Sequence, residues 1–270
     1  MMDKITLGRY YPGESPIHRM DPRLKIILAI LTMTAVFVVK KPLPLALLSG
    51  GILGTILLSR IPFRQVALSI RPILFVIIFA FFLNLFTVDG NELVRIGPLH
   101  ITDASLETAL RMAIRLILLI VSTSVILTLT TTPILIADAM EALMKPLERV
   151  RFPVHELAMM MSIALRFVPT LAEETSKIMK AQSSRGADYD TGGIIKKAKG
   201  LVSVLVPLFI SAFRRAEDLA VAMEARCYRG GKGRTKLKVM RLTRLDAWAT
   251  AVSAAFLAVL GLLQFTSILP

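Results

Sequence analysis

The feature that most limits how this chain folds is a series of apolar segments that are almost free of charge. They are 26–39, 43–59, 65–88, 116–137 and 247–270, and the one charged residue within them is Arg71. A helix needs about 20 apolar residues to cross the roughly 30 Å hydrocarbon core of a bilayer. The segments therefore predict about five transmembrane helices.

The first segment is short for a full span. Lys25 precedes it and Lys40 and Lys41 follow it, and the long stems of these lysines let their ammonium groups reach the interfaces. Asp21 followed by Pro22 is a sound start for this helix, since an aspartate N-cap often precedes a proline at the first helical position. We therefore expect a helical hairpin of two spans.

The distribution of basic residues predicts the orientation. Of the 33 lysines and arginines, 20 lie in 131–244, together with 11 acidic residues, whereas the loop 89–104 contains only Arg95. Short cytoplasmic segments are enriched in basic residues. We expect the N-terminus inside and the C-terminus outside the cell, against which only the Lys40-Lys41 turn argues.

Segment 131–244 combines helical periodicity with too many charges to cross a membrane as a whole. Apolar residues recur at helical spacing in three stretches, which are separated near Pro146 to Pro153 and at Gly192-Gly193. The apolar run 201–213 is short and contains Pro207. We expect three amphipathic cytoplasmic helices; in an alternative with the same sidedness, 155–172 and 201–213 are two further spans.

Taken together, these patterns predict an all-α polytopic membrane protein. Its parts are a cytoplasmic N-terminal segment (1–23), a membrane domain of four helices (24–130), a cytoplasmic domain of long amphipathic helices (131–244) and a last transmembrane helix (245–270). We expect the chain to lie in a cell membrane.

Residues with catalytic or metal-binding chemistry are sparse. His18, His100 and His155 are far apart and Cys227 is the single cysteine, so no metal-ligand spacing is present. A phosphate-binding Gly-x-x-x-x-Gly-Lys-Ser/Thr loop is absent as well. No acidic residue lies in a predicted span, and we interpret Arg71, Arg111 and Arg115 as interfacial arginines. We expect no enzymatic activity, no cofactor and no metal.

Two further patterns concern surfaces. Gly50 and Gly54 form a Gly-x-x-x-Gly spacing that allows close helix packing, within this chain or with another subunit. A basic cluster between Arg226 and Arg244 contains no acid. Anionic lipid and nucleic acid both attract such a cluster, but its place before the last span is explained by orientation, so we expect contact with membrane lipid and none with nucleic acid.

Two short tripeptides end the second and third amphipathic stretches. Ser184-Arg185-Gly186 and Ala225-Arg226-Cys227 each place an arginine between small residues. Small flanks let a helix tip approach a groove closely, and a guanidinium forks onto carboxylates or carbonyls. The pattern is typical of a docking tip, although such short repeats also arise by chance.

With these residues in view, the chain resembles the transmembrane T subunit (EcfT) of energy-coupling factor transporters. The resemblance covers essentially the whole length. It rests on Ile17-His18-Arg19-Met20-Asp21-Pro22-Arg23-Leu24-Lys25, Thr131-Thr132-Pro133, Ala137-Asp138-Ala139-Met140-Glu141, Lys145-Pro146-Leu147, Pro153-Val154-His155-Glu156-Leu157, Ala164-Leu165-Arg166-Phe167-Val168-Pro169, Ala181-Gln182-Ser183-Ser184-Arg185-Gly186 and Met223-Glu224-Ala225-Arg226-Cys227-Tyr228.

The resemblance implies a coupling function. In that family two Ala-Arg-Gly motifs cap coupling helices, and each engages one of two ABC ATPase subunits; here they correspond to Arg185 and Arg226, with Ser184 in place of one alanine and Cys227 in place of one glycine. ATPase movement then reorients a substrate-binding S component for uptake of vitamins or other micronutrients. The alternatives are a self-sufficient secondary transporter or channel, and a membrane-tethered adaptor.

Overall fold

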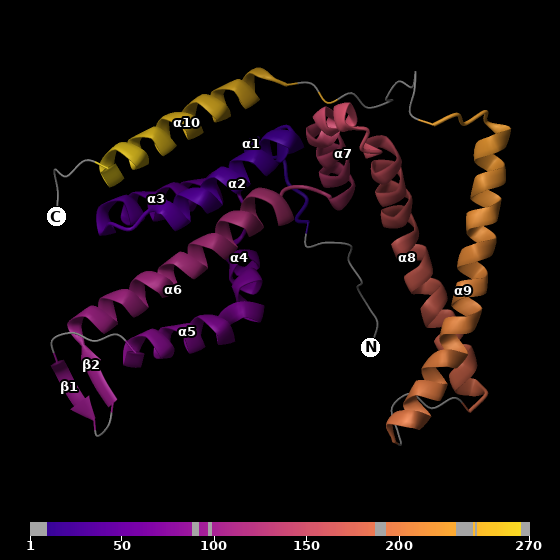
Figure 1. Cartoon of the computed structure of the whole chain (residues 1–270), viewed down its shortest axis with the longest axis horizontal. Helices are drawn as coiled ribbons and strands as arrows, with labels where there is room; N and C mark the ends of the chain where they lie inside the picture. The colour runs from indigo at the N-terminus through magenta and orange to yellow at the C-terminus, as the bar shows by residue number, and fades with distance from the viewer. Residues whose placement is uncertain are drawn as a thin grey trace. The chain divides into compact units, whose positions relative to one another are not determined.

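The computed structural model describes residues 10–87, 92–96, 99–186, 193–230, 240 and 242–265. The chain forms two compact units (Figure 1). The bundle unit comprises Gly8–Ala139 and Val239–Pro270, and the long-helix unit comprises Met1–Leu7 and Met140–Lys238. Much of the predicted basic cluster, including Lys232, Arg234, Lys236, Lys238 and Arg241, lies outside the described residues.

The bundle unit is built from helices joined by tight turns. Its elements are α1 (Pro16–Arg19), α2 (Pro22–Val38), α3 (Pro42–Ser59), α4 (Phe63–Ile70), the short 3-10 helix η1 (Arg71–Ile73), α5 (Leu74–Thr87), β1 (Glu92–Ile96), β2 (Leu99–Thr102), α6 (Asp103–Thr123), the π-helical turn η2 (Ser124–Thr128) and α10 (Arg244–Phe265). The predicted start of α2 is confirmed, because the Asp21 carboxylate accepts a hydrogen bond from the Arg23 amide at 2.9 Å and Pro22 opens the helix.

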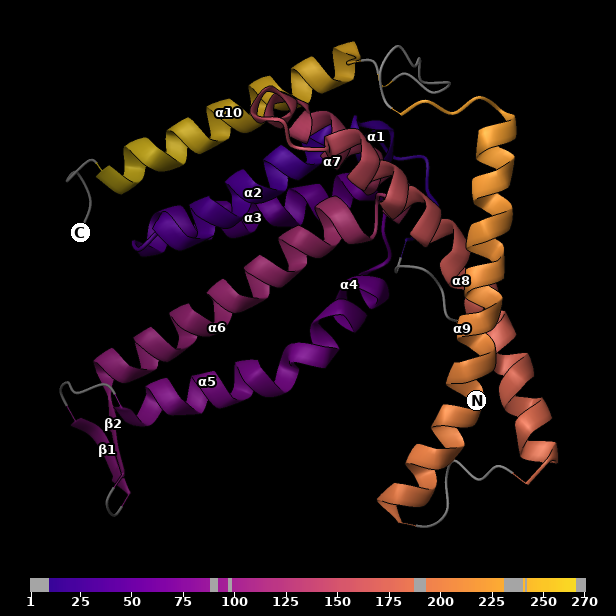
Figure 2. The ribbon, with the colours of Figure 1, turned by 45° about the vertical axis from the view of Figure 1, so that its right-hand side comes forward.

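The core of the bundle lies between α2, α3 and α6, which run side by side in both ribbon views (Figures 1 and 2). Val36, Leu48 and Val125 are fully buried there. The outward faces carry many exposed apolar side chains, such as Phe75 and Phe79 on α5. That pattern suits helices whose outer surface meets lipid rather than water.

Helix α10 is fastened to the α2–α3 hairpin at both ends. At its start, Asp246 accepts a hydrogen bond from the Asp21 amide at 2.8 Å. At its end, the Gln264 side chain accepts from the amides of Lys40 and Lys41 at 3.1 and 3.3 Å. These bonds lie at opposite ends of α2, so α10 runs parallel to that helix.

The fourth predicted segment, 116–137, has the wrong boundaries. Helix α6 begins at Asp103, behind a capping box formed by Thr102 and Ser105, and the helical run ends at Thr128. The chain admits the earlier start because its charges are satisfied: Arg111 pairs with Glu107 one turn away. Arg115 donates to the carbonyl of Val39 at 2.8 Å, which places a cation at the C-terminal end of α2.

A small β-hairpin connects α5 to α6, where the sequence suggested only an outer loop. Strands β1 and β2 pair antiparallel, with Val94 opposite Ile101 and Arg95 opposite His100. The all-α assignment holds for the rest of the described bundle unit.

Five helical segments in the described part of the chain are long and apolar enough to cross a membrane. They are Pro42–Ser59, Phe63–Thr87, Asp103–Thr128, Val154–Ser184 and Arg244–Phe265. Four correspond to predicted spans. Helix α2, the first predicted span, has 17 residues, about 26 Å at the helical rise. The remaining candidate, Val154–Ser184, contains 155–172, one of the two alternative spans. The other, 201–213, lies in Ile194–Ala225, which is not among the candidates.

The structure contains the three predicted amphipathic helices, two of them wholly in the long-helix unit. Helix α7 (Pro133–Met144) leads into it from the bundle unit, followed by η3 (Lys145–Val150), α8 (Val154–Ser184) and α9 (Ile194–Ala225). Prolines at 146 and 153 account for the first break. The other predicted break, Gly192-Gly193, falls at the edge of the described residues. Helices α8 and α9 have 31 and 32 residues and contain Pro169 and Pro207.

Candidate functional site

Helices α8 and α9 pack against each other and are joined by a polar contact at the crossing. Glu174 of α8 accepts hydrogen bonds from Ser211 and from Arg215 of α9, the latter at 2.7 Å. The two acceptor oxygens of one carboxylate therefore hold two successive turns of the partner helix. This contact resists sliding of one helix along the other.

The two predicted docking tips have nearly the same backbone geometry. Ser184 is the last residue of α8 and Ala225 the last residue of α9. Arg185 and Arg226 are the C-caps, both with φ of −91° and with ψ of 8° and 15°. The third residue of each tip is left-handed, with φ of 87° at Gly186 and 55° at Cys227.

Hydrogen bonds explain this shared shape. After α9, the Cys227 amide donates to the carbonyl of Glu224 at 2.8 Å and the Tyr228 amide to that of Met223 at 3.0 Å. This is the Schellman arrangement, which satisfies the last carbonyls of a helix and requires a left-handed residue after the cap. After α8, the Gly186 amide makes the corresponding bond to Ser183 at 3.0 Å. The third position of each tip therefore favours glycine, and a cysteine there costs about 1–2 kcal/mol.

Both cap arginines are available for a partner. Their side chains are exposed, as are their flanking residues, and neither guanidinium has a hydrogen bond or ion pair to another described residue. One tip ends α8 and the other ends α9, a helix of 32 residues and about 48 Å in length. Two separate contact points are thus presented by one helix pair.

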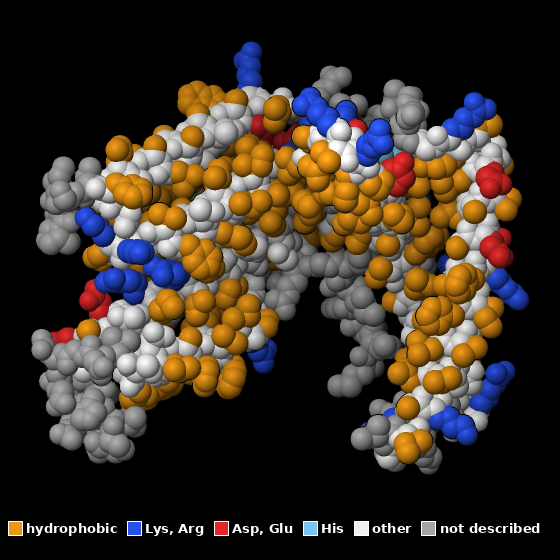
Figure 3. Space-filling view, in the orientation of Figure 1, with side chains coloured by type: hydrophobic (Ala, Val, Ile, Leu, Met, Phe, Trp, Pro, Cys, Tyr) orange, Lys and Arg blue, Asp and Glu red, His pale blue; other side chains and the backbone are white. Residues whose placement is uncertain are grey.

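Apolar side chains cover much of the visible face of α8 and α9 (Figure 3). The exposed apolar residues of α9 include Leu201, Leu205, Phe209 and Phe213, which recur every fourth residue. Residues at this spacing form one stripe along a helix. Helix α9 therefore carries an apolar strip between its two charged ends.

The predicted packing glycines lie elsewhere, on α3. A Cβ atom added to Gly50 or Gly54 would meet nothing within 4 Å, whereas one added to Gly51 would lie 2.6 Å from the ring of Phe256. Within this chain, Gly51 is thus the glycine that admits close packing between α3 and α10. Close packing at Gly50 and Gly54 therefore stays a prediction, and its partner would be another molecule.

A buried polar cluster at the start of α2 and α10 was missed by the sequence analysis. Lys25 is only 1% exposed, so the expectation that it reaches the interface is wrong. Its ammonium donates to the carbonyls of His18 and Thr130 and to the hydroxyl of Thr131, at 3.3, 3.0 and 3.1 Å. These bonds use all three ammonium protons, which is why the side chain stays inside.

Asp246 provides one of the two opposing charges in this cluster, and Asp21 provides the other. Asp246 is 2% exposed and accepts from the amides of Asp21 and Thr243 and from the Thr243 hydroxyl, each at 2.8 Å. Asp246 and Asp21 both attract the charge of Lys25. The sequence offered one signal for this cluster, because Lys25 and Asp246 each directly precede an apolar segment. It does not reveal that the two residues belong to one cluster.

His18 completes the connection to the N-terminal segment. Its ring contacts the Ser15 hydroxyl at 2.6 Å and the Tyr11 carbonyl at 3.0 Å. Burial lowers the pKa of His18, and the charge of Lys25 acts in the same direction, although the bond to Tyr11 opposes both. The other histidine with a described side chain, His155, pairs with Glu141 at 3.3 Å. No three His, Cys, Asp or Glu residues gather as metal ligands in the described ranges.

Comparison with known proteins identifies the family. The profile of the CbiQ family, described as a cobalt transport protein, matches residues 13–237. An energy-coupling factor transporter transmembrane protein EcfT from Ruminiclostridium cellulolyticum is 49% identical over 98% of this chain and 99% of its own length. The chain belongs to the EcfT family. EcfT proteins from Thermosediminibacter oceani and Bacillus subtilis are 50% and 45% identical over 99% and 98% of this chain, and 98% and 99% of their own lengths.

As a member of the EcfT family, the chain is a transmembrane component of an energy-coupling factor transporter. Such a component works in a complex with other subunits and is not itself named as an enzyme. The resemblance found in the sequence is therefore confirmed, as is the helical membrane fold.

Proposed function

We propose that the chain is the coupling subunit of an ABC importer, and that Arg185 and Arg226 each engage one of two ATPase subunits. The observation that carries this proposal is the shared geometry of the two tips. In each tip the arginine is the C-cap residue of its helix and lies between small residues. Its side chain is exposed and has no partner among the described residues. A guanidinium held in this way suits a fork onto carboxylates or carbonyls of a groove.

The helix pair is suited to transmit movement. Each helix spans more than 30 residues, and the contact of Glu174 with Ser211 and Arg215 joins the two near their crossing. When the two ATPases approach each other on binding ATP, the tips move with them. The crossing then turns this approach into a change of angle between α8 and α9.

The apolar strip of α9 is the proposed contact for the S component. Leu205, Phe209 and Phe213 are exposed at helical spacing, and Met160 and Met161 of α8 add flexible apolar side chains. A membrane protein that binds the vitamin or other micronutrient would cover this surface. Reorientation of α8 and α9 would then move that protein and release its cargo.

The proposed topology places the N-terminus and the coupling domain 131–244 in the cytoplasm of a prokaryotic cell. The excess of basic residues in that segment supports this orientation. It also agrees with ATPases, which use cytoplasmic ATP, docking at Arg185 and Arg226.

Charge reversal of the two arginines tests the proposal. We expect Arg185→Glu and Arg226→Glu each to weaken the binding of one ATPase, and the double variant to lose uptake, because an interfacial arginine fork is worth about 2–5 kcal/mol. The measurement is co-purification of the ATPases with the chain, together with substrate uptake by cells that express all subunits.

Arg229→Glu is the matched control. Arg229 is exposed, as Arg226 is, but lies beyond the cap, so its reversal is expected to leave uptake unchanged. Full uptake by the double variant would refute the assignment of the tips. A chain that transports substrate alone in liposomes would instead favour a secondary transporter, and one that co-purifies with no ATPase or S component would favour an adaptor.

A further inference from the structure

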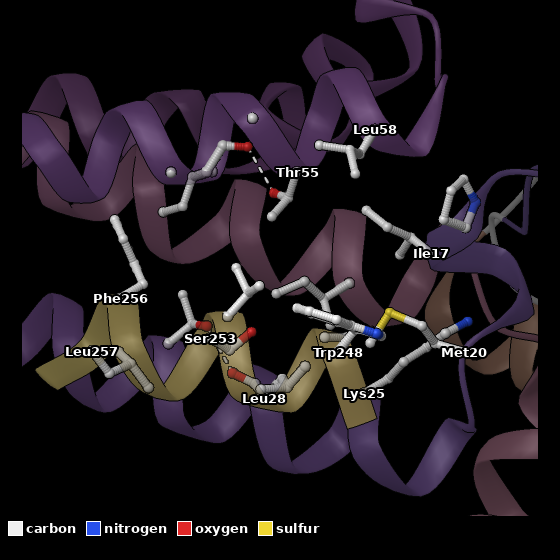
Figure 4. A pocket seen from close by; sticks show the side chains of 18 of the residues that line it. Ile17, Met20, Lys25, Leu28, Thr55, Leu58, Trp248, Ser253, Phe256 and Leu257 are labelled. Carbon is white, nitrogen blue, oxygen red and sulfur yellow. Dashed lines mark hydrogen bonds between the residues drawn. The ribbon is translucent and has the colours of Figure 1, made fainter. Parts of the chain in front are cut away.

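A groove in the bundle unit lies between α2, α3 and α10. Its volume is about 480 Å³. Figure 4 shows Leu28 of α2, Thr55 and Leu58 of α3, and Trp248 and Ser253 of α10 around this space. The α8–α9 pair takes no part in it, so the groove is separate from the proposed coupling surface.

The groove offers no free hydrogen-bond donor from its threonines or its lysine. Thr32 and Thr55 donate to carbonyls of their own helices, Leu28 and Ile52, both at 2.7 Å. The three protons of Lys25 are used by His18, Thr130 and Thr131. Most other lining side chains are apolar, so the occupant that fits is a hydrocarbon.

The length and width of the groove distinguish an acyl chain from a transmembrane helix as its occupant. Along α10 the lining runs from Leu245 to Leu257, about 18 Å at the helical rise, which is slightly more than the roughly 15 Å of one leaflet. Dividing the volume by this length gives a mean cross-section of about 27 Å², which is the area of a circle about 6 Å wide, against about 10–12 Å for a helix with its side chains. The groove is thus too narrow for a transmembrane helix but accepts a single acyl chain.

The end of the groove nearest the start of α10 has the features of a membrane interface. Trp248 lines the groove there, one turn into α10, and is 74% exposed. Tryptophan favours the headgroup level of a bilayer. Arg244, which directly precedes the lining residue Leu245, is exposed and has no partner among the described residues. The phosphate of a lipid at this level would therefore lie beside the guanidinium of Arg244.

We propose that the groove between α2, α3 and α10 binds one acyl chain of an anionic phospholipid, whose headgroup lies beside Arg244. The bound chain fills space that the side chains leave open between α3 and α10. Its headgroup lies at the end of the bundle where the Lys25–Asp246 cluster joins α2 to α10.

The single tryptophan of the chain, Trp248, is a built-in probe. The full-length chain is reconstituted in nanodiscs with increasing fractions of phosphatidylglycerol or phosphatidylcholine that carry bromine on the acyl chains, and tryptophan quenching is recorded. We expect a saturable component that reaches half its value at about fivefold less phosphatidylglycerol than phosphatidylcholine, the preference expected for one basic residue near the headgroup.

Two glycines of α3 supply a matched pair of variants. A Cβ atom added at Gly54 or at Gly50 meets nothing within 4 Å, but of these two glycines only Gly54 lines the groove. Gly54→Leu should therefore abolish the saturable component, and Gly50→Leu should retain it. Ser253→Leu fills the groove from α10 and should repeat the effect of Gly54→Leu.

Arg244→Gln separates the headgroup from the acyl chain, because it should remove the preference for phosphatidylglycerol but keep saturation. Equal quenching by both lipids in the unchanged chain would overturn the anionic assignment. Saturable quenching that survives both Gly54→Leu and Ser253→Leu would overturn the groove as the site.

Discussion

Replacing Asp246 with alanine tests whether the buried polar cluster stabilises the bundle. The change removes the acceptor for the amides of Asp21 and Thr243, each now bonded at 2.8 Å, and it removes an opposing charge from Lys25, which is 1% exposed. Each buried amide left without an acceptor costs about 1–3 kcal/mol, and Lys25 loses one of the two carboxylates that oppose its charge, so we expect a total cost of about 3–5 kcal/mol. For a chain of this size we expect the unfolding temperature to fall by about 6–20 °C.

The assay is thermal unfolding of the purified chain in one detergent, followed by the fluorescence of Trp248 or by circular dichroism. Asp218→Ala is the control, since Asp218 is an exposed acidic residue of α9, and its loss should change stability by less than about 0.5 kcal/mol. An unfolding temperature for Asp246→Ala that equals that of the control would refute the reasoning.

A double variant sharpens the result. Lys25→Met combined with Asp246→Asn removes two opposite charges from the cluster together, so the double variant should cost less than the sum of Lys25→Met and Asp246→Asn measured singly. Additive costs would show that Lys25 and Asp246 do not stabilise each other.

Two further predictions concern Cys227 and His18. Cys227→Gly should raise the free energy of unfolding by about 1 kcal/mol, since glycine adopts the left-handed conformation at this position without strain, and it should retain ATPase binding; chemical denaturation measures the first and co-purification the second. Burial lowers the pKa of His18, so its contribution to stability should be fully present above the ordinary pKa of about 6.5 and decline as the pH falls toward the lower folded value. His18→Gln should remove that part of the pH dependence of the unfolding temperature, and an unchanged profile would contradict the assignment.

Patterns that are local in the sequence led to correct predictions. The start of α2 follows from Asp21 and Pro22, and the bounds of α8 and α9 follow from helical periodicity and flanking proline and glycine. The tripeptides 184–186 and 225–227 were also predicted at helix ends, where the structure places them. Their common left-handed cap was not, because Cys227 occupies a position where glycine is the usual residue.

Errors arose where a charge is satisfied by a distant residue. The fourth segment was predicted from the charge-free run 116–137 alone, whereas α6 begins at Asp103 and includes Glu107, Arg111 and Arg115. Arg111 and Glu107 pair within one turn, but Arg115 depends on the carbonyl of Val39, 76 residues away. For the same reason Lys25 was expected at the interface, although its partners at Thr130 and Thr131 lie more than 100 residues along the chain.

The sequence alone determined that the chain is a helical membrane protein with a basic amphipathic region and two arginine tips, because hydropathy, periodicity and capping depend on neighbouring residues. The tertiary structure decided which charges are buried, how α10 is fastened to the α2–α3 hairpin, and that a narrow groove remains between these helices. Such features depend on which surfaces meet in space, and removal of a charge from water is tolerated only where the fold brings its partners together.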